Sequence, residues 1–323
     1  MTDFIKKAKA VIIGHAVGDA LGVPVEFRTR EYLDKNPITD MLGYGTYSVP
    51  KGTWSDDTSM SLCSLDSLSK GKIDYDDITL NFGKWYYYDK FTATNEMFDV
   101  GNTCSEAIHR YFKEKQPYGK CGLSNEYSNG NGSLMRIHPF TLYLIRINKN
   151  KMLINHLKTI GEASSLTHAH PRSKVACIIY SFILWELIEH PCKDSVNMAL
   201  QNVKIVYSHY SNGWGALTDE YDELKAFNRI FDGIQKLTRN EIQSNGYIVH
   251  TLEAAVWCLL TTDSYKECVL KAVNLGDDTD TTAAVAGGLA GALYGYDTIP
   301  EDWRNTLLKR EYIEELCEKA FNK

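Results

Sequence analysis

The chain has 323 residues, of which 44% are hydrophobic and 24% charged, as is typical of a globular protein with a substantial core. Its formal net charge is −6, and no long run of lysine or arginine occurs. Proteins that bind duplex nucleic acid usually have a basic face. We therefore expect no nucleic-acid partner, although charge alone does not exclude a nucleic-acid substrate.

The N-terminal 22 residues superficially resemble a signal peptide. However, His15 and Asp19 interrupt the apolar stretch, and no small-x-small cleavage site follows. The longest apolar stretch, residues 175–188, contains polar residues and is too short to span a bilayer. Eight cysteines are scattered without a CxxC pair, several of them in apolar stretches, which is typical of reduced, buried thiols. We therefore expect a cytoplasmic protein without a membrane partner.

Hydrophobic residues recur at helical spacing along most of the chain, beginning with one face formed by Phe4, Ala8, Val11, Ile12 and His15. Alternating strand patterns are short and few, and residues 43–49 (GYGTYSV) are the best strand candidate. Three polar stretches rich in Gly, Asn, Ser and Tyr are predicted to be long loops, which are often functional. These loops cover residues 90–104, 118–133 and 205–222.

Two further segments predict helices in the core. Residues 172–188 are apolar on nearly all sides, and Pro171 suits the first turn of such a helix. Residues 283–293 (AAVAGGLAGAL) are small, which lets neighbouring backbones approach closely. Because no linker-like composition shift and no internal repeat occurs, we predict a single domain over residues 1–323.

Two acidic clusters, residues 55–58 (SDDT) and 277–282 (DDTDTT), precede helix-like segments. Each cluster alone is explained as a helix N-cap, because Ser, Thr and Asp satisfy free amides there. Together they contain more oxygen-bearing side chains than capping requires. If they pack together, their carboxylates repel one another unless cations lie between them. Oxygen ligands without Cys or His indicate Mg²⁺ or Mn²⁺, with Ca²⁺ a weaker alternative.

Several motifs, in order along residues 10–296, resemble the ADP-ribosylglycohydrolase family, and above all its bacterial ADP-ribosylarginine hydrolase branch. They are GDALGVPVEF (18–27), GTWSDDT (52–58), FDVGNT (98–103), NGNGSLMR (129–136), LTHAH (166–170), NGYIVHTLEAAVW (245–257) and LGDDTDTTAAVAGGLAGALYG (275–295). The resemblance implies an all-α, multi-helix domain with two Mg²⁺ or Mn²⁺ ions in a central cleft. It also implies hydrolysis of an ADP-ribosylated protein, most of all at arginine, with ADP-ribose as the product.

The resemblance further implies roles for particular residues. The expected metal ligands are Ser55, Asp56, Asp57, Asp278, Asp280 and Thr281. Glu26 and Asp99 are the expected catalytic carboxylates, with Glu26 beside the metals and Asp99 facing the substrate. The expected substrate-binding residues are Asn102, Asn131, Gly132, Ser133, His168 and Tyr247, with the amides of the glycine-rich segment directed at a diphosphate.

Structural explanations stay open for several of these residues. Glu26 alone is also explained as a surface charge, and Asp99 as a residue that orders its own loop. The glycines at 130 and 132 are also explained as residues that form turns. His168 and Tyr247 are also residue types that commonly have structural roles. We expect Arg136 to support the fold by pairing with a carboxylate rather than to bind phosphate.

Two positions depart from the family pattern. Asp277 stands where many members have Gly, and we place it outside the metal ligands. His250 stands where the family commonly has Asp, which leaves the surrounding hydrogen bonds undetermined.

Three alternative functions are considered. Residues 278–282 (DTDTT) match the DxDxT signature of haloacid-dehalogenase-type phosphatases, but no βαβ pattern follows them. A second alternative is a binding or structural relative that has lost activity. A third is a hydrolase acting on ADP-ribosylserine, a nucleic-acid base or free ADP-ribosyl compounds.

Overall fold

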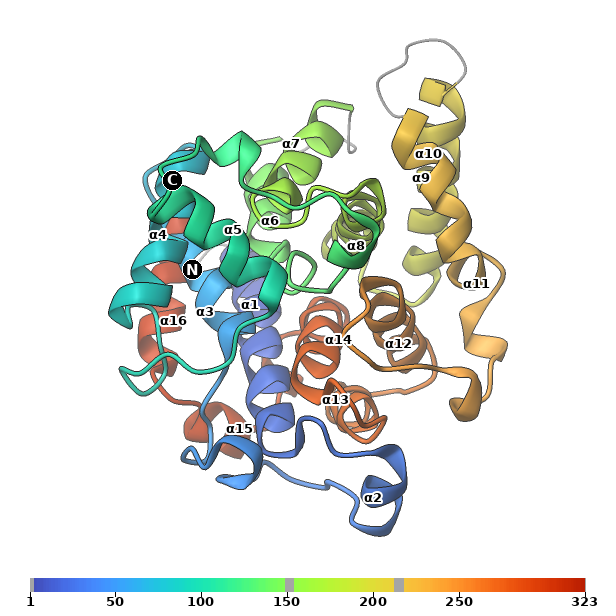
Figure 1. Ribbon diagram of the computed structural model, residues 1–323. Helices are drawn as coiled ribbons and strands as arrows, with labels where there is room; N and C mark the ends of the chain where they lie inside the picture. Colours follow the sequence, from blue (N-terminus) through green and yellow to red (C-terminus); the bar gives the residue numbers. More distant parts are fainter. Residues whose placement is uncertain (1–2, 149–153, 212–217, 323) are drawn as a thin grey trace.

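Helices form almost all of the regular structure in residues 3–148, 154–211 and 218–322, the parts of the chain that the computed structural model describes (Figure 1). These ranges contain isolated β-bridges but no β-sheet, so the predicted all-α class is confirmed. The α-helices are α1 (Asp3–Gly22), α2 (Arg30–Lys35), α3 (Asp56–Leu68), α4 (Tyr75–Tyr88), α5 (Asn102–Phe112), α6 (His138–Ile147), α7 (Ile154–Ser165), α8 (Pro171–Glu189), α9 (Asp194–Ser211), α10 (Thr218–Glu223), α11 (Asn228–Phe231), α12 (Ile248–Leu260), α13 (Tyr265–Val273), α14 (Thr279–Tyr294), α15 (Glu301–Thr306) and α16 (Arg310–Phe321).

Helices α1 and α14, from opposite ends of the chain, lie side by side at the centre of the domain (Figure 1). Their backbones touch through glycines. A Cβ atom on Gly287 would overlap the carbonyl oxygen of Gly14, and one on Gly291 would overlap that of Ala10. The close packing predicted for residues 283–293 is therefore confirmed, and it occurs against α1.

The other helices surround this central pair. Helices α3, α4, α5 and α16 lie on one side, and α8, α12 and α13 on the other (Figure 1). Helix α8 is the predicted core helix: it begins at Pro171 and is buried along nearly its whole length. The ring nitrogen of His170 caps it by accepting a hydrogen bond from the Arg172 N–H at 3.1 Å.

The strand predicted at residues 43–49 is wrong. A single antiparallel bridge joins Tyr44 to Val49 around the short 3-10 helix η2 (Gly45–Tyr47). Tyr44 and Ser48 have φ angles of 65° and 56°, which reverse the chain and prevent an extended strand. This segment is therefore a tight turn.

The predicted loops have mixed outcomes. Residues 118–133 contain only short 3-10 helices, and most of 90–104 is irregular until α5 begins at Asn102, as expected. The loop predicted at 205–222 is wrong where the structure describes it. Helix α9 continues to Ser211 and α10 begins at Thr218, while residues 212–217 lie outside the described part.

Residues 3–25 are long and apolar enough to cross a bilayer by length and composition, but the most apolar 18-residue stretch of this segment is fully buried inside the protein, as expected of a core helix. The cysteines are unpaired, and all except Cys192 are buried. Both findings agree with the packing expected from the sequence.

The glycine contacts between α1 and α14 predict a strong effect of one methyl group. We expect Gly291→Ala to lower the free energy of unfolding by about 1–3 kcal/mol or more, because the added carbon meets the backbone of α1. Urea unfolding followed by circular dichroism measures this change. Gly161→Ala in α7 is the matched control, since its Cβ would meet only the Lys174 side chain at 3.7 Å. Equal stability of the two variants would contradict the prediction.

Candidate active site

A buried carboxylate of α1 holds the N-terminus of α3. Asp19 accepts hydrogen bonds from the Ser55 N–H at 2.9 and 3.1 Å and from the N–H and hydroxyl of Thr58 at 3.0 and 2.6 Å. Ser55 itself is the N-cap residue of α3. The first acidic cluster therefore starts a helix whose end is fixed to α1 by charge-assisted hydrogen bonds.

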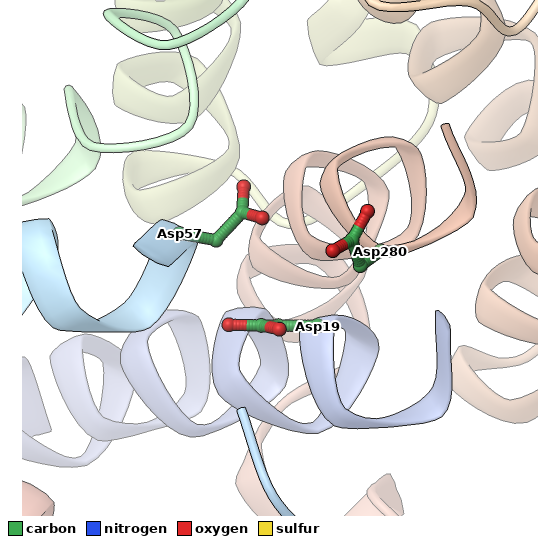
Figure 2. Close-up of side chains that lie close together, drawn as sticks. All are labelled: Asp19, Asp57 and Asp280. Carbon is green, nitrogen blue, oxygen red and sulfur yellow. The ribbon is translucent and has the colours of Figure 1, made fainter. Parts of the chain in front are cut away.

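The second acidic cluster starts α14, at the same end of α1. The Thr279 hydroxyl donates to the carbonyl oxygen of Gly22 at 2.8 Å, and a Cβ atom on Gly22 would overlap the backbone of Asp280. Figure 2 shows the side chains of Asp19, Asp57 and Asp280 converging from α1, α3 and α14. One carboxylate oxygen from each lies within 4.8 Å of the others. The predicted meeting of the two clusters is thus observed.

Several carboxylate oxygens in this cluster are buried and have no hydrogen-bond partner within the described chain. They are Asp57 Oδ1, Asp278 Oδ1, Asp280 Oδ2 and Glu26 Oε2. Burial, reinforced by neighbouring negative charges, raises the pKa values of Asp57 and Asp280 well above the ordinary range. Unpaired buried charges are costly, and hard cations with oxygen ligands remove that cost. The cluster is therefore suited to hold metal ions.

The two predicted hydroxyl ligands also lie in this cluster. Ser55 and Thr281 both donate to Asp57 Oδ2, at 3.1 and 3.2 Å. The amide of Asn131 donates to Asp278 Oδ2 at 2.9 Å and to the Thr251 hydroxyl at 2.9 Å. Asn131, which we predicted to bind substrate, therefore also fixes the orientation of Asp278.

A second carboxylate group, formed by Glu26, Asp99 and Asp280, adjoins the first. Burial, with the negative charges of Asp99 and Asp278, raises the pKa of Glu26 to about 8. Burial and Asp278 raise the pKa of Asp99 to about 6. The two predicted catalytic carboxylates thus lie together, and both hold protons more tightly than ordinary carboxylates do.

Tyr47 joins these two carboxylates, although sequence reasoning did not identify it. Its hydroxyl lies close enough to Glu26 and Asp99 to oppose the rise in the pKa values of both carboxyls, and its ring contacts Phe98 with centroids 5.0 Å apart. Tyr47 lies in η2, the segment that was predicted to be a strand.

The segment that carries Asp99, residues 89–101, has an unusual backbone. Asp89, Phe91, Asn95 and Asp99 all have φ angles between 55° and 64°, a region that non-glycine residues rarely adopt. The ammonium group of Lys309 donates to the Thr92 carbonyl oxygen at 2.7 Å and to Asn95 Oδ1 at 2.8 Å. Asp99 is therefore presented by a strained loop that is fixed to the start of α16.

The acidic groups open into a cavity of about 330 Å³, within the size range of small-molecule sites. Exposed aromatic side chains, Phe27 and Tyr127, lie among its lining residues. Most of the residues predicted from the sequence also line it. They are Glu26, Asp56, Asp99, Asn102, Asn131, Gly132, His168, Asp278 and Thr281.

Ser133 and Tyr247 are not among the lining residues. The Ser133 side chain is buried near Ser164 Oγ at 3.0 Å and Cys177 Sγ at 3.5 Å. The Tyr247 hydroxyl accepts a hydrogen bond from Arg172 at 3.1 Å, while its neighbour Gly246 lines the cavity. The Ser133 side chain is therefore buried away from the cavity, whereas Tyr247 is half-buried beside a lining residue, and its role toward a ligand stays a prediction.

The residues that depart from the family pattern are also located. Asp277 is exposed and has a φ angle of 60°, a conformation that glycine adopts without strain. His250 packs edge-on against Tyr247, with ring centroids 4.9 Å apart, and its Nδ1 lies 2.8 Å from Asn245 Oδ1. Neither side chain belongs to the buried carboxylate cluster, as we expected for Asp277.

The partner predicted for Arg136 is wrong. Arg136 is fully buried and supports the fold, but it donates to the carbonyl oxygens of Ala163 and Ser164 at 3.1 and 3.5 Å and to the Thr167 hydroxyl at 2.7 Å. No carboxylate pairs with it in the described part of the chain. The C-terminal carbonyls of α7 carry partial negative charge and replace the carboxylate that we expected.

Comparison with known proteins identifies similar chains over the full length. The family model described as ADP-ribosylglycohydrolase matches residues 1–323. ADP-ribosylarginine hydrolase Tri1 of Serratia proteamaculans is 33% identical, covering 99% of this chain and 80% of the relative. ADP-ribosyl-dinitrogen reductase glycohydrolase of Rhodospirillum rubrum is 32% identical, covering 93% of this chain and 90% of the relative. A solved structure titled ADP-ribosylglycohydrolase-related protein complex is similar with a TM-score of 0.79 and 28% identity, covering 100% of this chain and 99% of that chain.

The raised pKa of Glu26 predicts that this side chain destabilises the metal-free protein. Below its ordinary pKa of 4.5, Glu26 is protonated in both the folded and the unfolded states. As the pH rises from 4.5 to about 8, the unfolded state releases this proton first, so folding stability falls. In EDTA at pH 8, Glu26→Gln should therefore raise the free energy of unfolding by about 1–3 kcal/mol, and at pH 4.5 it should have little effect.

Urea unfolding at the two pH values measures this difference. Glu96→Gln, on an exposed glutamate of the Asp99 loop, is the matched control. A Glu26→Gln protein that is no more stable than wild type at pH 8 would contradict the electrostatic analysis.

Proposed function

Because the chain belongs to the ADP-ribosylglycohydrolase family, we propose that it is a metal-dependent glycohydrolase that removes ADP-ribose from arginine side chains of proteins. Glycohydrolase activity follows from the family and from relatives that match nearly the full chain. The arginine acceptor is supported by the name of the Serratia proteamaculans relative, and an ADP-ribosylated protein substrate by that of the Rhodospirillum rubrum relative.

The observation that carries the proposal is the convergence of unpaired buried carboxylates on one cavity. The side of the cavity that these carboxylates form is strongly acidic. It suits two kinds of cation, namely metal ions and the guanidinium group of an arginine acceptor. A serine acceptor has no positive charge and would gain nothing from the carboxylates of Glu26 and Asp99 beside it. The charge of the cavity therefore favours arginine.

Two divalent cations, Mg²⁺ or Mn²⁺, fit the donor set at the ends of α3 and α14. The proposed ligands are Ser55, Asp56, Asp57, Asp278, Asp280 and Thr281. When bound, such ions supply Lewis-acid chemistry, which includes polarising water and holding vicinal hydroxyls. Asp19 is not among the proposed ligands, because its carboxylate accepts hydrogen bonds from the start of α3. It supports the ligands by fixing that helix end.

The chain's own carboxylates then divide the remaining tasks. Hydrolysis at an anomeric carbon passes through an oxocarbenium-like state and requires proton transfers at the attacking water and at the leaving group. Glu26, at the edge of the metal-binding cluster, orients and deprotonates the water. Asp99 contacts the guanidine nitrogen, holds its positive charge and controls the proton there. Tyr47 lies beside both carboxylates and favours their charged forms.

The alternatives are weaker. A haloacid-dehalogenase-type phosphatase needs an α/β fold, and no sheet occurs among the described residues. An inactive relative would be expected to lose acidic ligands, yet the expected set is complete here. Because the cysteines are unpaired and mostly buried, we include a cytoplasmic location in the proposal.

The first prediction concerns metal dependence. Removal of divalent ions with EDTA should abolish turnover, and Mg²⁺ or Mn²⁺ should restore it. Asp280→Asn should lower kcat by more than roughly 100-fold, since even groups that only orient metal ligands commonly contribute 10–100-fold. Asp277→Asn, three residues before Asp280 and exposed, is the control that should retain activity. Full activity after exhaustive chelation would contradict the metal requirement.

A second prediction concerns the acceptor. Defined peptides carrying ADP-ribose on arginine or on serine, compared at equal concentration, should differ in kcat/KM by at least roughly 100-fold in favour of arginine. Mass spectrometry of the released peptide measures both rates. Equal or faster release from serine would overturn the arginine assignment and leave the family unchanged.

The third prediction separates the two catalytic carboxylates. Asp99→Asn should lower kcat on the arginine-linked substrate by roughly 10²–10⁴-fold, because it removes the group that controls the leaving-group proton. A substrate whose leaving group needs no proton should be affected much less. Glu26→Gln should slow both substrates, and both variants should still bind ADP-ribose. If Asp99→Asn slowed the two substrates equally, Asp99 would not act at the leaving group.

A further inference from the structure

The strongest unexplained feature of the cavity is the hydrogen-bond chain behind His168. This histidine lines the cavity and is 2% exposed. Its Nδ1 lies 2.9 Å from the hydroxyl oxygen of Thr167, which in turn accepts a hydrogen bond from Arg136 at 2.7 Å. The chain runs from a buried arginine through a hydroxyl to an imidazole at the cavity wall.

The direction of each hydrogen bond follows from the chemistry of the groups. Arg136 can only donate, so one lone pair of the Thr167 oxygen is occupied and its single hydrogen remains free to donate. Two acceptors lie near that hydrogen, His168 Nδ1 and the sulfur of Cys104. A thiol sulfur is a weak acceptor, whereas a neutral imidazole nitrogen is a good one. The hydroxyl therefore donates to Nδ1, which leaves the imidazole proton on Nε2.

We propose that Arg136 and Thr167 are positioning residues that lock His168 in the Nε2–H tautomer, so that it donates a hydrogen bond to an anionic oxygen of the substrate. The identity of that oxygen, one of the diphosphate of an ADP-ribosyl group, rests on the proposed function. The tautomer itself does not.

The Nε2 edge of the ring faces the glycine-rich segment. Cβ atoms built on Gly130 and Gly132 would lie 3.5 and 3.6 Å from His168 Nε2, so the ring and this segment share one wall of the cavity. The N–H groups of Gly132 and Ser133 have no acceptor within the described chain. The N–H of Gly132 and the Nε2 side of His168, both on residues that line the cavity, therefore lie on one wall, as in other anion-binding loops.

The His168 ring itself carries no charge near neutral pH. Burial, together with the positive charge of Arg136, lowers the pKa of His168 to about 3, so the ring stays neutral at physiological pH. A neutral ring with a fixed tautomer donates from one nitrogen only. The attraction for an anion comes in addition from Arg136, which has no carboxylate partner among the described residues.

A purely structural role would explain part of this arrangement. Arg136 also caps the C-terminus of α7 through the carbonyl oxygens of Ala163 and Ser164, so its replacement would affect folding. That role also uses the Thr167 oxygen as an acceptor for Arg136, but it makes no demand on the tautomer of His168. The test therefore uses Thr167, with a variant of equal shape and one that restores the hydroxyl.

The experiment records long-range ¹H–¹⁵N NMR spectra of protein labelled at histidine, with His168 assigned from a His168→Gln spectrum. Protonated and unprotonated ring nitrogens are well separated in such spectra. Wild type and Thr167→Ser should show a neutral His168 protonated at Nε2 between pH 5.5 and 8. Thr167→Val, which keeps the shape but loses the donor, should populate the Nδ1–H tautomer. ADP-ribose affinity, measured by calorimetry, should be roughly three- to tenfold weaker for Thr167→Val and close to wild type for Thr167→Ser.

The possible failures are distinguishable. An Nδ1–H or cationic His168 in wild type, or an unchanged tautomer in Thr167→Val, overturns the inference. A changed tautomer with unchanged ADP-ribose affinity overturns the donor role. If wild type shows the Nε2–H form but neither wild type nor any variant binds ADP-ribose, the tautomer assignment stands and the proposed function fails. Thermal unfolding of each variant shows whether the fold is intact.

Discussion

The site depends on the carboxylate of Asp19 at the N-terminus of α3. Hydrogen bonds from Ser55 and Thr58 satisfy both oxygens of this buried carboxylate and fix α3 to α1. The glycine contacts between α1 and α14 bring the second acidic helix end to the same place. With Asp19 already satisfied, the unpaired oxygens in this part of the cluster belong to Asp57 and Asp280. One carboxylate, Asp19, thus fixes the arrangement of the helices, while Asp57 and Asp280 keep oxygens that are available to ligands.

Two kinds of structure meet around the cavity. The buried carboxylate cluster is formed by helix ends that glycine contacts and capping hydrogen bonds hold in place. Glu26, Tyr47 and Asp99 come instead from turns and a loop, where backbone conformations are less common. A rigid centre suits these carboxylates, because it holds them close together despite their mutual repulsion when no cation is present. On the more irregular side, the positions of the side chains depend on turn and loop conformations instead of on helix packing.

Sequence reasoning succeeded where the signal was local. The acidic clusters are contiguous and start helices, and the core helix at Pro171 and the small-residue helix carry their patterns within one segment. Asp19 was noticed only as an interruption of an apolar stretch, because its partner Ser55 lies 36 residues away. Tyr47 was missed because alternating residues suggested a strand, whereas left-handed backbone at Ser48 makes a turn. Arg136 was assigned a carboxylate because sequence does not show that the end of α7 lies beside it.

The loop that presents Asp99 has a consequence for how acceptor preference can diverge among related enzymes. Its tip is attached to the helical frame through the two hydrogen bonds of Lys309, and Asp89 accepts hydrogen bonds from Thr92 and Met97 within the loop itself. Natural selection can therefore alter the acceptor side of the cavity by exchanging this short segment, without disturbing the carboxylates at the helix ends. The same separation suits grafting: a loop from a relative with another acceptor is transferable if a cation at position 309 still meets its tip.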